Sequence, residues 1–322
     1  MYEQFYGLRE RPFDLSPDPR FLFLSGGHRE ALTHLRYGLS GRPGLTVLVG
    51  EAGTGKTTLV RAALSTSESC QRSTIVHLSN PTLTRAEFFE YLASSLSFTD
   101  AAARSKTRFL CELEAANVTV AQQLGVLALV VDEAQSLPYE LLEEIRLLTN
   151  IESPSGRSLA VALVGQPELA VRLNDSRLRQ LKQRVALRCE LAPLDRRETA
   201  AYIAARVRVA GGNGALLFTR EAVSLIYERS KGIPRTISVI CDNALVSGFA
   251  LQRKPVGRDV VLEVCRDFEL GERERAAVSV DEPAFHGPPT RAPDSRAATP
   301  AGDSRKMFGG FTRPRRFSFF QD

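Results

Sequence analysis

The chain has 322 residues, of which 43% are hydrophobic and 25% charged, and its formal net charge is +5. This balance is typical of soluble globular proteins with about two domains, and it excludes a small scaffold stabilised by disulfides or metals. The longest apolar run precedes Asp132 and is far shorter than the roughly 18 residues of a membrane-spanning helix. The N-terminus has no signal-peptide pattern, so we expect a cytoplasmic protein.

The positive charge is spread along the chain. Residues 271–322 hold nine basic and seven acidic side chains, which leaves residues 1–270 nearly balanced. A nucleic-acid-binding domain normally concentrates its basic residues on one face. The net charge alone therefore gives little support to DNA binding.

Short apolar or β-branched runs alternate with helical segments in the first 193 residues. This alternation predicts a parallel α/β sheet. The most apolar run, Val126–Val131, is expected in the middle of the sheet because both of its faces are hydrophobic. The five predicted strands are Leu45–Val49, Ser73–Leu78, Val126–Val131, Leu159–Val164 and Val185–Leu191.

The pattern becomes helical after Pro193. Asp195 and Glu198 have the spacing of a capping box, which predicts a helix over about 196–210. Further helical runs follow Thr219, Pro234 and Arg258 and are expected to end near Leu270. We therefore divide the chain into an α/β domain over 1–193 and a helical domain over 194–270.

The composition changes beyond Gly271. Residues 271–304 are rich in Pro, Ala and Ser and are predicted to form a disordered linker. Residues 305–322 interleave basic side chains with phenylalanines. The favoured interpretation is a solvated tail, and the alternative is a peripheral contact with an acidic membrane surface or a partner.

The strongest motif directly follows the first predicted strand and fits the P-loop pattern G-x-x-x-x-G-K-[ST]. Its glycines allow backbone N–H groups to surround a phosphate at a helix N-terminus. Lys56 is expected to bind the β and γ phosphates, and the Thr57 hydroxyl is expected to ligate Mg²⁺. The alternative is a glycine turn without a ligand. The predicted nucleotide contacts are Gly50, Glu51, Ala52, Gly53, Thr54, Gly55, Lys56, Thr57 and Thr58.

Two carboxylates, Asp132 and Glu133, follow the most apolar strand. Ligands of open α/β sheets bind at the carboxyl ends of the strands, which places Asp132 near the P-loop. Asp132 is expected to hold Mg²⁺ with Thr57, and Glu133 is the candidate base for the attacking water. The alternative is that the pair only caps the following helix. Together with the P-loop, the pair favours hydrolysis of ATP over binding alone.

Positive charge for the transition state has two candidate sources. One is the segment 177–188, which contains Arg177, Arg179, Arg184 and Arg188, and the other is Arg235. Either could equally be a solvated basic face.

At this point the sequence resembles the AAA+ ATPases of the ExeA-like general secretion pathway type, which are also found in exopolysaccharide export loci. The resemblance extends over residues 1 to about 270, and Gly-Gln-Pro-Glu-Leu together with Gly-Ile-Pro-Arg are its most selective motifs. The motifs that carry it, besides the P-loop, are Phe5–Leu8, Pro12–Phe13, Pro17–Pro19, His28–Leu32, Asp132–Gln135, Leu141–Leu148, Val164–Leu169, Gln183–Arg184 and Gly232–Arg235.

The resemblance implies an αβα core with the strand order 5-1-4-3-2, followed by a helical lid. It implies that Gln166 is a sensor near the γ phosphate and that Arg235 is a lid sensor that contacts the phosphates. Arg184 would be an arginine finger supplied to a neighbouring subunit, although the other arginines of its segment remain candidates. The stretch from Pro17 to Leu32, within the N-terminal segment 1–43, would line the adenine end.

Some members of this family continue into a membrane span and a region that binds peptidoglycan. The linker and tail of this sequence replace both, so we expect a cytoplasmic ATPase, in peripheral contact with the inner membrane at most, that acts through partners. The leading hypothesis is an oligomeric Mg²⁺-dependent ATPase that drives a cell-envelope secretion or export system. The alternatives are a DNA-binding regulatory ATPase of the TniB-like transposition type and a nucleotide-gated interaction module.

Overall fold

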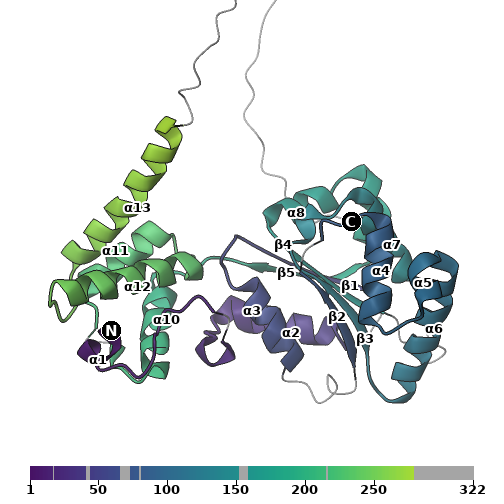
Figure 1. The fold of residues 1–322 in the computed structure, drawn as a ribbon, viewed down its shortest axis with the longest axis horizontal. Helices are drawn as coiled ribbons and strands as arrows, with labels where there is room; N and C mark the ends of the chain where they lie inside the picture. Colours follow the sequence, from purple (N-terminus) through teal and green to yellow (C-terminus); the bar gives the residue numbers. More distant parts are fainter. Residues whose placement is uncertain are drawn as a thin grey trace, which may run out of the picture. The chain divides into compact units, whose positions relative to one another are not determined.

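Five parallel strands form one sheet in the order β2-β3-β4-β1-β5 (Figure 1). This confirms the predicted α/β fold and the strand order implied by the resemblance. The prediction for the most apolar run needs one correction: β3 lies inside the sheet next to the edge strand β2, and β4 is the middle strand. Apolarity on both faces could not distinguish the middle strand from its neighbour, because β3 and β4 are both buried along their whole length. The strands are β1 (Leu45–Gly50), β2 (Thr74–Leu78), β3 (Leu127–Val131), β4 (Ala160–Gly165) and β5 (Val185–Leu191).

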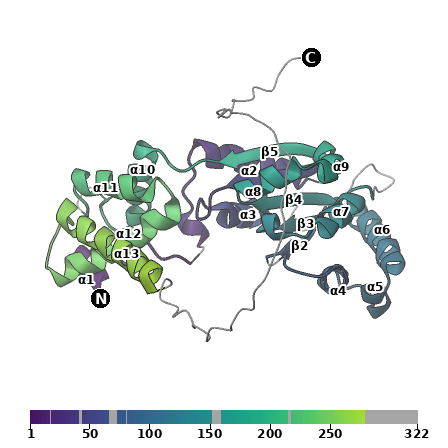
Figure 2. The same cartoon turned by 90° about the horizontal axis from the view of Figure 1, so that it is seen from above.

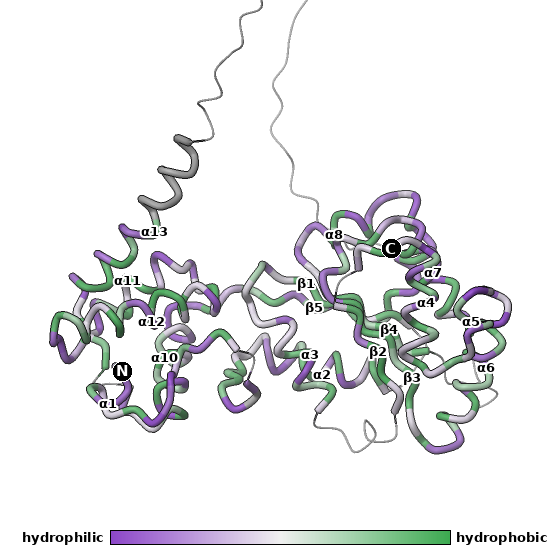
Figure 3. The backbone as a smooth tube through the Cα atoms, in the orientation of Figure 1, coloured by the Kyte–Doolittle hydropathy of each residue, from purple (hydrophilic) through white to green (hydrophobic). Residues whose placement is uncertain are grey.

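Helices cover both faces of this sheet. Successive side chains of a strand point to opposite faces, so Val47 and Val49 of β1 enter one hydrophobic cluster and Leu48 enters another. The first cluster contains residues of α4, α6, α7, α8 and α9, and the second contains residues of α2 and α3. Figure 3 shows β3 in green along its length, as expected for a strand between two apolar layers. The helices of this region are α2 (Gly26–Gly38), α3 (Lys56–Ser65), α4 (Arg85–Ser95), α5 (Asp100–Arg104), α6 (Lys106–Gln122), α7 (Tyr139–Leu148), α8 (Pro167–Leu173) and α9 (Arg179–Gln183).

The chain is helical after β5, as predicted. Asp195 and Glu198 form the expected capping box at the start of α10. Thr219 caps α11, and Pro234 is the first residue of α12. These helices are α10 (Arg196–Val209), α11 (Arg220–Ser230), α12 (Pro234–Ala250) and α13 (Arg258–Val278), and we call them the helical region.

The first residues of the chain pack with the helical region. Tyr2 and Tyr6 of α1 (Tyr2–Tyr6), together with Phe13 and Phe21, belong to a third hydrophobic cluster built mainly from residues 194–265. The Tyr2 hydroxyl hydrogen-bonds the Asp242 carboxylate of α12. Figure 2 shows α1 beside α12. The predicted segmentation assigned residues 1–43 to the α/β domain, whereas the beginning of that segment shares its core with the helices.

The computed structural model describes residues 1–16, 18–40, 44–65, 73–79, 81–151, 159–214 and 217–278. Met1–Arg275 form one compact unit. The last helix, α13, continues to Val278, beyond Leu270 where we expected it to end. Residues 272–277, Glu-Arg-Glu-Arg-Ala-Ala, are good helix formers, so the glycine before them does not stop the helix. Most of the predicted linker and the whole tail lie outside the described residues.

Within the stretches of the chain that the structure describes, each helix is too short or too polar to cross a bilayer.

Candidate functional site

The P-loop connects β1 to α3, which begins at Lys56. Gly53 and Gly55 have φ angles of 83° and 99°, a left-handed conformation that glycine adopts without strain. The loop is closed on itself by hydrogen bonds from the Thr54 amide and hydroxyl to the Glu51 carbonyl. The strand, the tight loop and the helix therefore have the arrangement that binds phosphate in P-loop proteins.

Lys56 is buried beneath this loop, with 5% of its surface exposed. Its Nζ donates hydrogen bonds to the carbonyl oxygens of Gly50, at 2.8 Å, and Glu51, at 3.0 Å. Burial lowers the pKa of the ammonium group, and the nearby carboxylates of Glu133 and Asp132 oppose that shift. A lysine has three donors, so one remains for a phosphate oxygen.

Thr57 and Asp132 form a direct pair. The Thr57 hydroxyl donates to Oδ2 of Asp132 at 2.5 Å, and Oδ1 of Asp132 accepts the amide of Glu133 at 3.0 Å. Asp132 is buried at the end of β3, and its amide donates to the carbonyl of Leu78 in β2. A hydroxyl and a carboxylate are the hard oxygen donors that Mg²⁺ prefers, and phosphate and water oxygens commonly complete its shell. The two residues therefore fit the ion that the P-loop implies.

Glu133 has a left-handed backbone (φ 51°, ψ 36°). Its Oε2 accepts hydrogen bonds from Nε2 of Gln135, at 2.5 Å, and from Nε2 of Gln166, at 3.2 Å. These two amides, with a smaller contribution from Lys56, lower the pKa of the Glu133 carboxyl. The sequence motif did not show that Gln166, at the end of β4, lies within reach of Glu133.

A cavity of about 370 Å³ opens beside the P-loop. It is lined by the P-loop from Gly53 to Thr58, by Glu133, by Arg235, by residues 14–16, 18 and 21–23 of the N-terminal segment and by one face of α10. The structure therefore brings together most of the predicted nucleotide contacts. Residues that were predicted but do not line the cavity are Gly50, Glu51, Ala52, Asp132, Gln166 and Arg184.

The helical region contacts the P-loop through α12. The amide of Arg235 donates to the Gly53 carbonyl at 3.1 Å, and the Leu194 amide donates to the Gly232 carbonyl at 2.9 Å. Gly232 has a φ of 75°, and a Cβ there would lie 1.9 Å from the carbonyl oxygen of Leu194. The turn before α12 is therefore shaped by a glycine that no other residue can replace without displacing the backbone.

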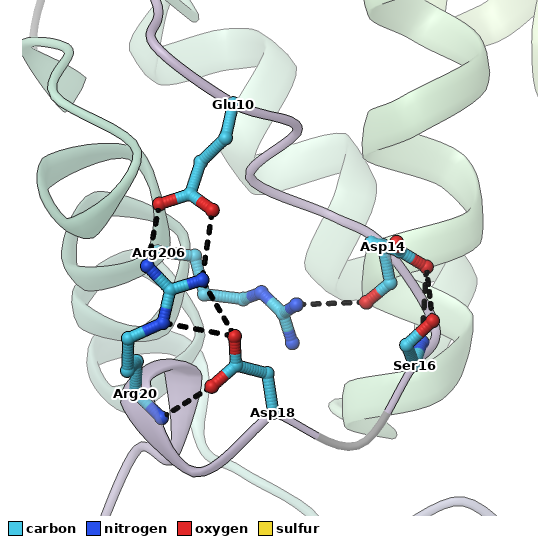
Figure 4. A network of polar contacts seen from close by, with 6 residues as sticks. All are labelled: Glu10, Asp14, Ser16, Asp18, Arg20 and Arg206. Atoms are coloured by element: carbon cyan, nitrogen blue, oxygen red, sulfur yellow. Dashed lines mark hydrogen bonds and ion pairs between the residues drawn. The ribbon is translucent and has the colours of Figure 1, made fainter.

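Charged residues of the N-terminal segment form a network of polar contacts near Arg206 (Figure 4), and Asp14, Asp18 and Arg206 of this group line the cavity. Arg20 pairs with Glu10 at 2.9 Å and with Asp18 at 2.7 Å. Arg206 of α10 donates to the carbonyl oxygens of Pro12 and Asp14. The Arg20 ion pairs hold the N-terminal segment together, and the Arg206 contacts tie it to the helical region.

The arginines of the segment 177–188 have different surroundings. Arg177 pairs with Asp175 at 2.7 Å, and its guanidinium lies 3.8 Å from the centre of the Tyr139 ring. Arg184 is exposed, directly follows α9 and donates to the side chain of Asn150. Arg179 and Arg188 are exposed as well. None of these four arginines lines the cavity of its own chain.

Comparison with known proteins identifies the family. A family model described as an AAA domain matches residues 39–173. General secretion pathway protein A of Aeromonas hydrophila is 40% identical to this chain over 253 residues, which cover 78% of the chain and 45% of that protein. The chain is an AAA-type P-loop ATPase. The 40% identity also confirms the resemblance to the general secretion pathway ATPases, although the chain spans less than half the length of this relative.

Solved structures agree with the fold of this AAA ATPase. The Aeropyrum pernix ORC2 protein in its ADPNP–ADP complexes is 19% identical, with a TM-score of 0.60 over 80% of this chain and 71% of that chain. The Drosophila ORC bound to DNA is also 19% identical, with a TM-score of 0.58 over 82% of this chain and 66% of that chain. At this level of identity the similarity concerns the fold alone.

The ATPase site includes His28, which belongs to the stretch Pro17–Leu32 expected at the adenine end, and two residues of α10 that the sequence motifs did not assign. His28 is buried at the start of α2, and its Nε2 lies 3.0 Å from the carbonyl oxygen of Thr54 in the P-loop. Tyr202 and Arg206 lie one turn apart on the face of α10 that lines the cavity. Their i, i+4 spacing places them on one helix face, but only the fold shows which face meets the nucleotide site.

Proposed function

We propose that the chain is an oligomeric, Mg²⁺-dependent ATPase that hydrolyses ATP to ADP and phosphate to drive assembly or operation of a cell-envelope secretion or export system. The biochemical part of the proposal rests on one observation: the P-loop and Glu133 line one cavity, and Thr57 of the P-loop hydrogen-bonds Asp132 behind it. The proposed role in a secretion or export system is supported by the 40% identity to general secretion pathway protein A.

The proposed mechanism assigns one task to each group. The P-loop amides and Lys56 bind the phosphates. Thr57 and Asp132 would hold Mg²⁺, which neutralises charge on the β and γ phosphate oxygens when bound. Glu133 accepts a proton from water as the water oxygen attacks the γ phosphorus and the bond to the bridging oxygen breaks. The products are ADP and inorganic phosphate.

The remaining polar groups are proposed to sense or complete the site. Gln166 hydrogen-bonds Glu133 and is proposed to orient the attacking water. Arg235 lines the cavity from α12 and is proposed to contact the phosphates as a lid sensor. Arg184 lies outside the cavity of its own chain, which supports a role as a finger for a neighbouring subunit in an oligomer.

We further propose that residues 194–270 act as the lid of the α/β domain 1–193, with the N-terminal segment supplying the adenine side. The cavity borders on all three regions, which supports this division. We place the protein in the cytoplasm, where ATP is available, in contact with partners at the inner membrane.

Steady-state hydrolysis of MgATP over a wide range of protein concentrations tests the biochemical proposal. Specific activity that rises with protein concentration and is lost in Glu133→Gln supports an oligomeric ATPase with Glu133 as its base. Activity that stays low until duplex DNA is added would instead favour a regulatory ATPase of the transposition type. Lys56→Ala is the matched variant that loses nucleotide binding itself.

The cellular proposal needs a test in cells. A strain that lacks the gene should lose export of a secreted reporter protein, and the wild-type gene should restore export. The Lys56→Ala gene, expressed at the same level, should not. Full export with Lys56→Ala would show that nucleotide binding is not needed for that process.

A further inference from the structure

The side chain of Gln135 bridges two elements of the ATPase site. It lies two residues after Glu133, in the short 3-10 helix Ala134–Ser136. Its Nε2 donates to Oε2 of Glu133 at 2.5 Å, while its Oε1 accepts the backbone amide of Gln166 at 3.0 Å. One amide group thus connects the carboxylate after β3 to the end of β4.

The surroundings of Gln135 fit this bridge closely. Gly165 ends β4, and a Cβ at that position would lie 2.8 Å from Oε1 of Gln135. Arg172 of α8 donates to the backbone carbonyls of Gln135 and, at 2.6 Å, of Leu137. The guanidinium of Arg172 also lies 4.8 Å from the centre of the Tyr139 ring. The loop that carries Gln135 is therefore held from both sides.

The hydrogen bonds leave the two oxygens of Glu133 in different states. Oε2 accepts both amide donors, from Gln135 and from Gln166. Oε1 accepts no hydrogen bond from any residue that the structure describes, and Glu133 lines the cavity. A carboxylate fixed through one oxygen presents the other in a defined direction. The left-handed backbone of Glu133 is uncommon for a residue other than glycine, so neighbouring contacts must maintain it.

We propose that Gln135 is a positioning residue for hydrolysis: it anchors Oε2 of Glu133 so that Oε1 faces the attacking water. This inference rests on the proposed role of Glu133 as the base. The same amide accepts the Gln166 backbone N–H, so the direction of Oε1 is linked to the position of the first turn of α8. A displacement of α8 then changes the rate of hydrolysis without changing the phosphate cradle.

Gln135→Met tests the proposal, because methionine has nearly the same length and makes neither hydrogen bond. We expect kcat to fall roughly ten- to a hundred-fold, as is usual when the partner that orients a reacting group is lost. The Kd for ATP should stay within about two-fold of wild type, since Gln135 does not line the cavity. Gln122→Met, at an exposed position of α6, is the matched control and should leave both constants unchanged.

A double-mutant cycle separates positioning from a general structural effect. If Gln135 acts through Glu133, Gln135→Met should not lower the residual rate of Glu133→Gln any further. Gln135→Asn keeps an amide side chain, but this side chain is too short to reach both Glu133 and the Gln166 backbone. It should show the same loss of kcat. This second variant decides the question if the methionine variant does not fold.

The outcomes are distinct. Wild-type kcat in Gln135→Asn or in folded Gln135→Met, with Glu133→Gln inactive, would overturn the positioning role and leave the proposed base in place. Equal losses in kcat and ATP affinity, or an additive loss in the double mutant, would also overturn it. Near-normal turnover of Glu133→Gln would remove the proposed base and with it the reason for positioning.

Discussion

The backbone amide of Arg235, in the first turn of α12, donates a hydrogen bond of 3.1 Å to the carbonyl oxygen of Gly53 in the P-loop. A Cβ at Gly53 would lie 2.8 Å from the Cβ of Arg235, so the two backbones approach each other as closely as glycine allows. The helical region therefore touches the phosphate loop through its main chain. The Gly53 backbone and the first turn of α12 are directly connected.

Gly53→Ala should weaken the binding of ATP. Its φ of 83° costs a residue with a Cβ about 1–2 kcal/mol, and the new methyl group would also press on Arg235. The P-loop without nucleotide can relieve this strain by changing its conformation, whereas the loop that surrounds a phosphate cannot. The strain therefore opposes binding, and the Kd for ATP should rise about 5- to 30-fold. Isothermal titration calorimetry measures this change.

Gly27→Ala is the matched control for that variant. Gly27 lies in α2 with nothing within 4 Å of an added Cβ, and alanine is the better helix former. Its affinity for ATP should equal that of wild type. An unchanged Kd in Gly53→Ala would show that the left-handed conformation and the contact with Arg235 are not needed for binding.

His28 should support the P-loop from behind. The Thr54 carbonyl can only accept, so Nε2 of His28 carries the hydrogen and Nδ1 accepts from the Ser25 hydroxyl at 2.8 Å. His28→Leu should lower both the midpoint of thermal unfolding and the affinity for ATP, because it leaves a buried carbonyl without a donor. His28→Gln can still donate to Thr54 and should recover some of the affinity. Equal affinities for the two variants would contradict a role for this hydrogen bond.

Arg206 should hold the N-terminal segment at the cavity mouth. Its guanidinium donates to Pro12, Asp14 and the Tyr202 hydroxyl, and it stacks 4.9 Å from the centre of the Phe21 ring. Arg206→Met removes all of these donors, so the backbone of residues 13–16 should exchange its amide hydrogens faster, and the affinity for ATP should fall several-fold. Arg208→Met, on the exposed face of α10, is the control and should change neither quantity. Hydrogen exchange measured by mass spectrometry reports the first effect.

Local patterns were sufficient for much of the fold and for some of the site. Each strand was visible as a short apolar run, and the capping box of Asp195 and Glu198 fixed the start of α10. The P-loop and the acidic pair after β3 depend on residues close together in sequence. The expectation that Asp132 lies near the P-loop came from its place at the carboxyl end of a strand, and the structure shows its side chain in direct contact with Thr57.

Contacts between residues far apart in the sequence could not be predicted from local patterns. Tyr2 and Asp242 are separated by 240 residues, and no periodicity in either segment indicates their contact. Gln135 was visible only as one residue of a motif, since its bridge to Gln166 exists only once β3 and β4 lie side by side. Gly271 suggested the end of the last helix, but the strong helix formers after it continue α13 to Val278.

Arg184 should be needed for hydrolysis but not for binding. Both arginines are exposed, but Arg177 pairs with the Asp175 carboxylate and the Tyr139 ring, whereas Arg184 contacts the neutral side chain of Asn150. Arg184→Ala should therefore bind ATP normally and lose most of its turnover, as expected when a charge that stabilises the transition state is removed. Parallel alanine variants of Arg179 and Arg188 identify the finger if Arg184→Ala keeps its activity.

Mixing two inactive variants then tests whether the finger acts between subunits. A subunit with Arg184→Ala keeps its own Glu133, and a subunit with Glu133→Gln keeps its own Arg184. If Arg184 serves the neighbouring site, a mixed oligomer contains sites with both groups, and ATP hydrolysis should return in the mixture. A mixture of Lys56→Ala with Glu133→Gln contains no complete site and should stay inactive. Failure of the first mixture to recover activity, with oligomers confirmed by light scattering, would mean that the arginine acts within its own chain.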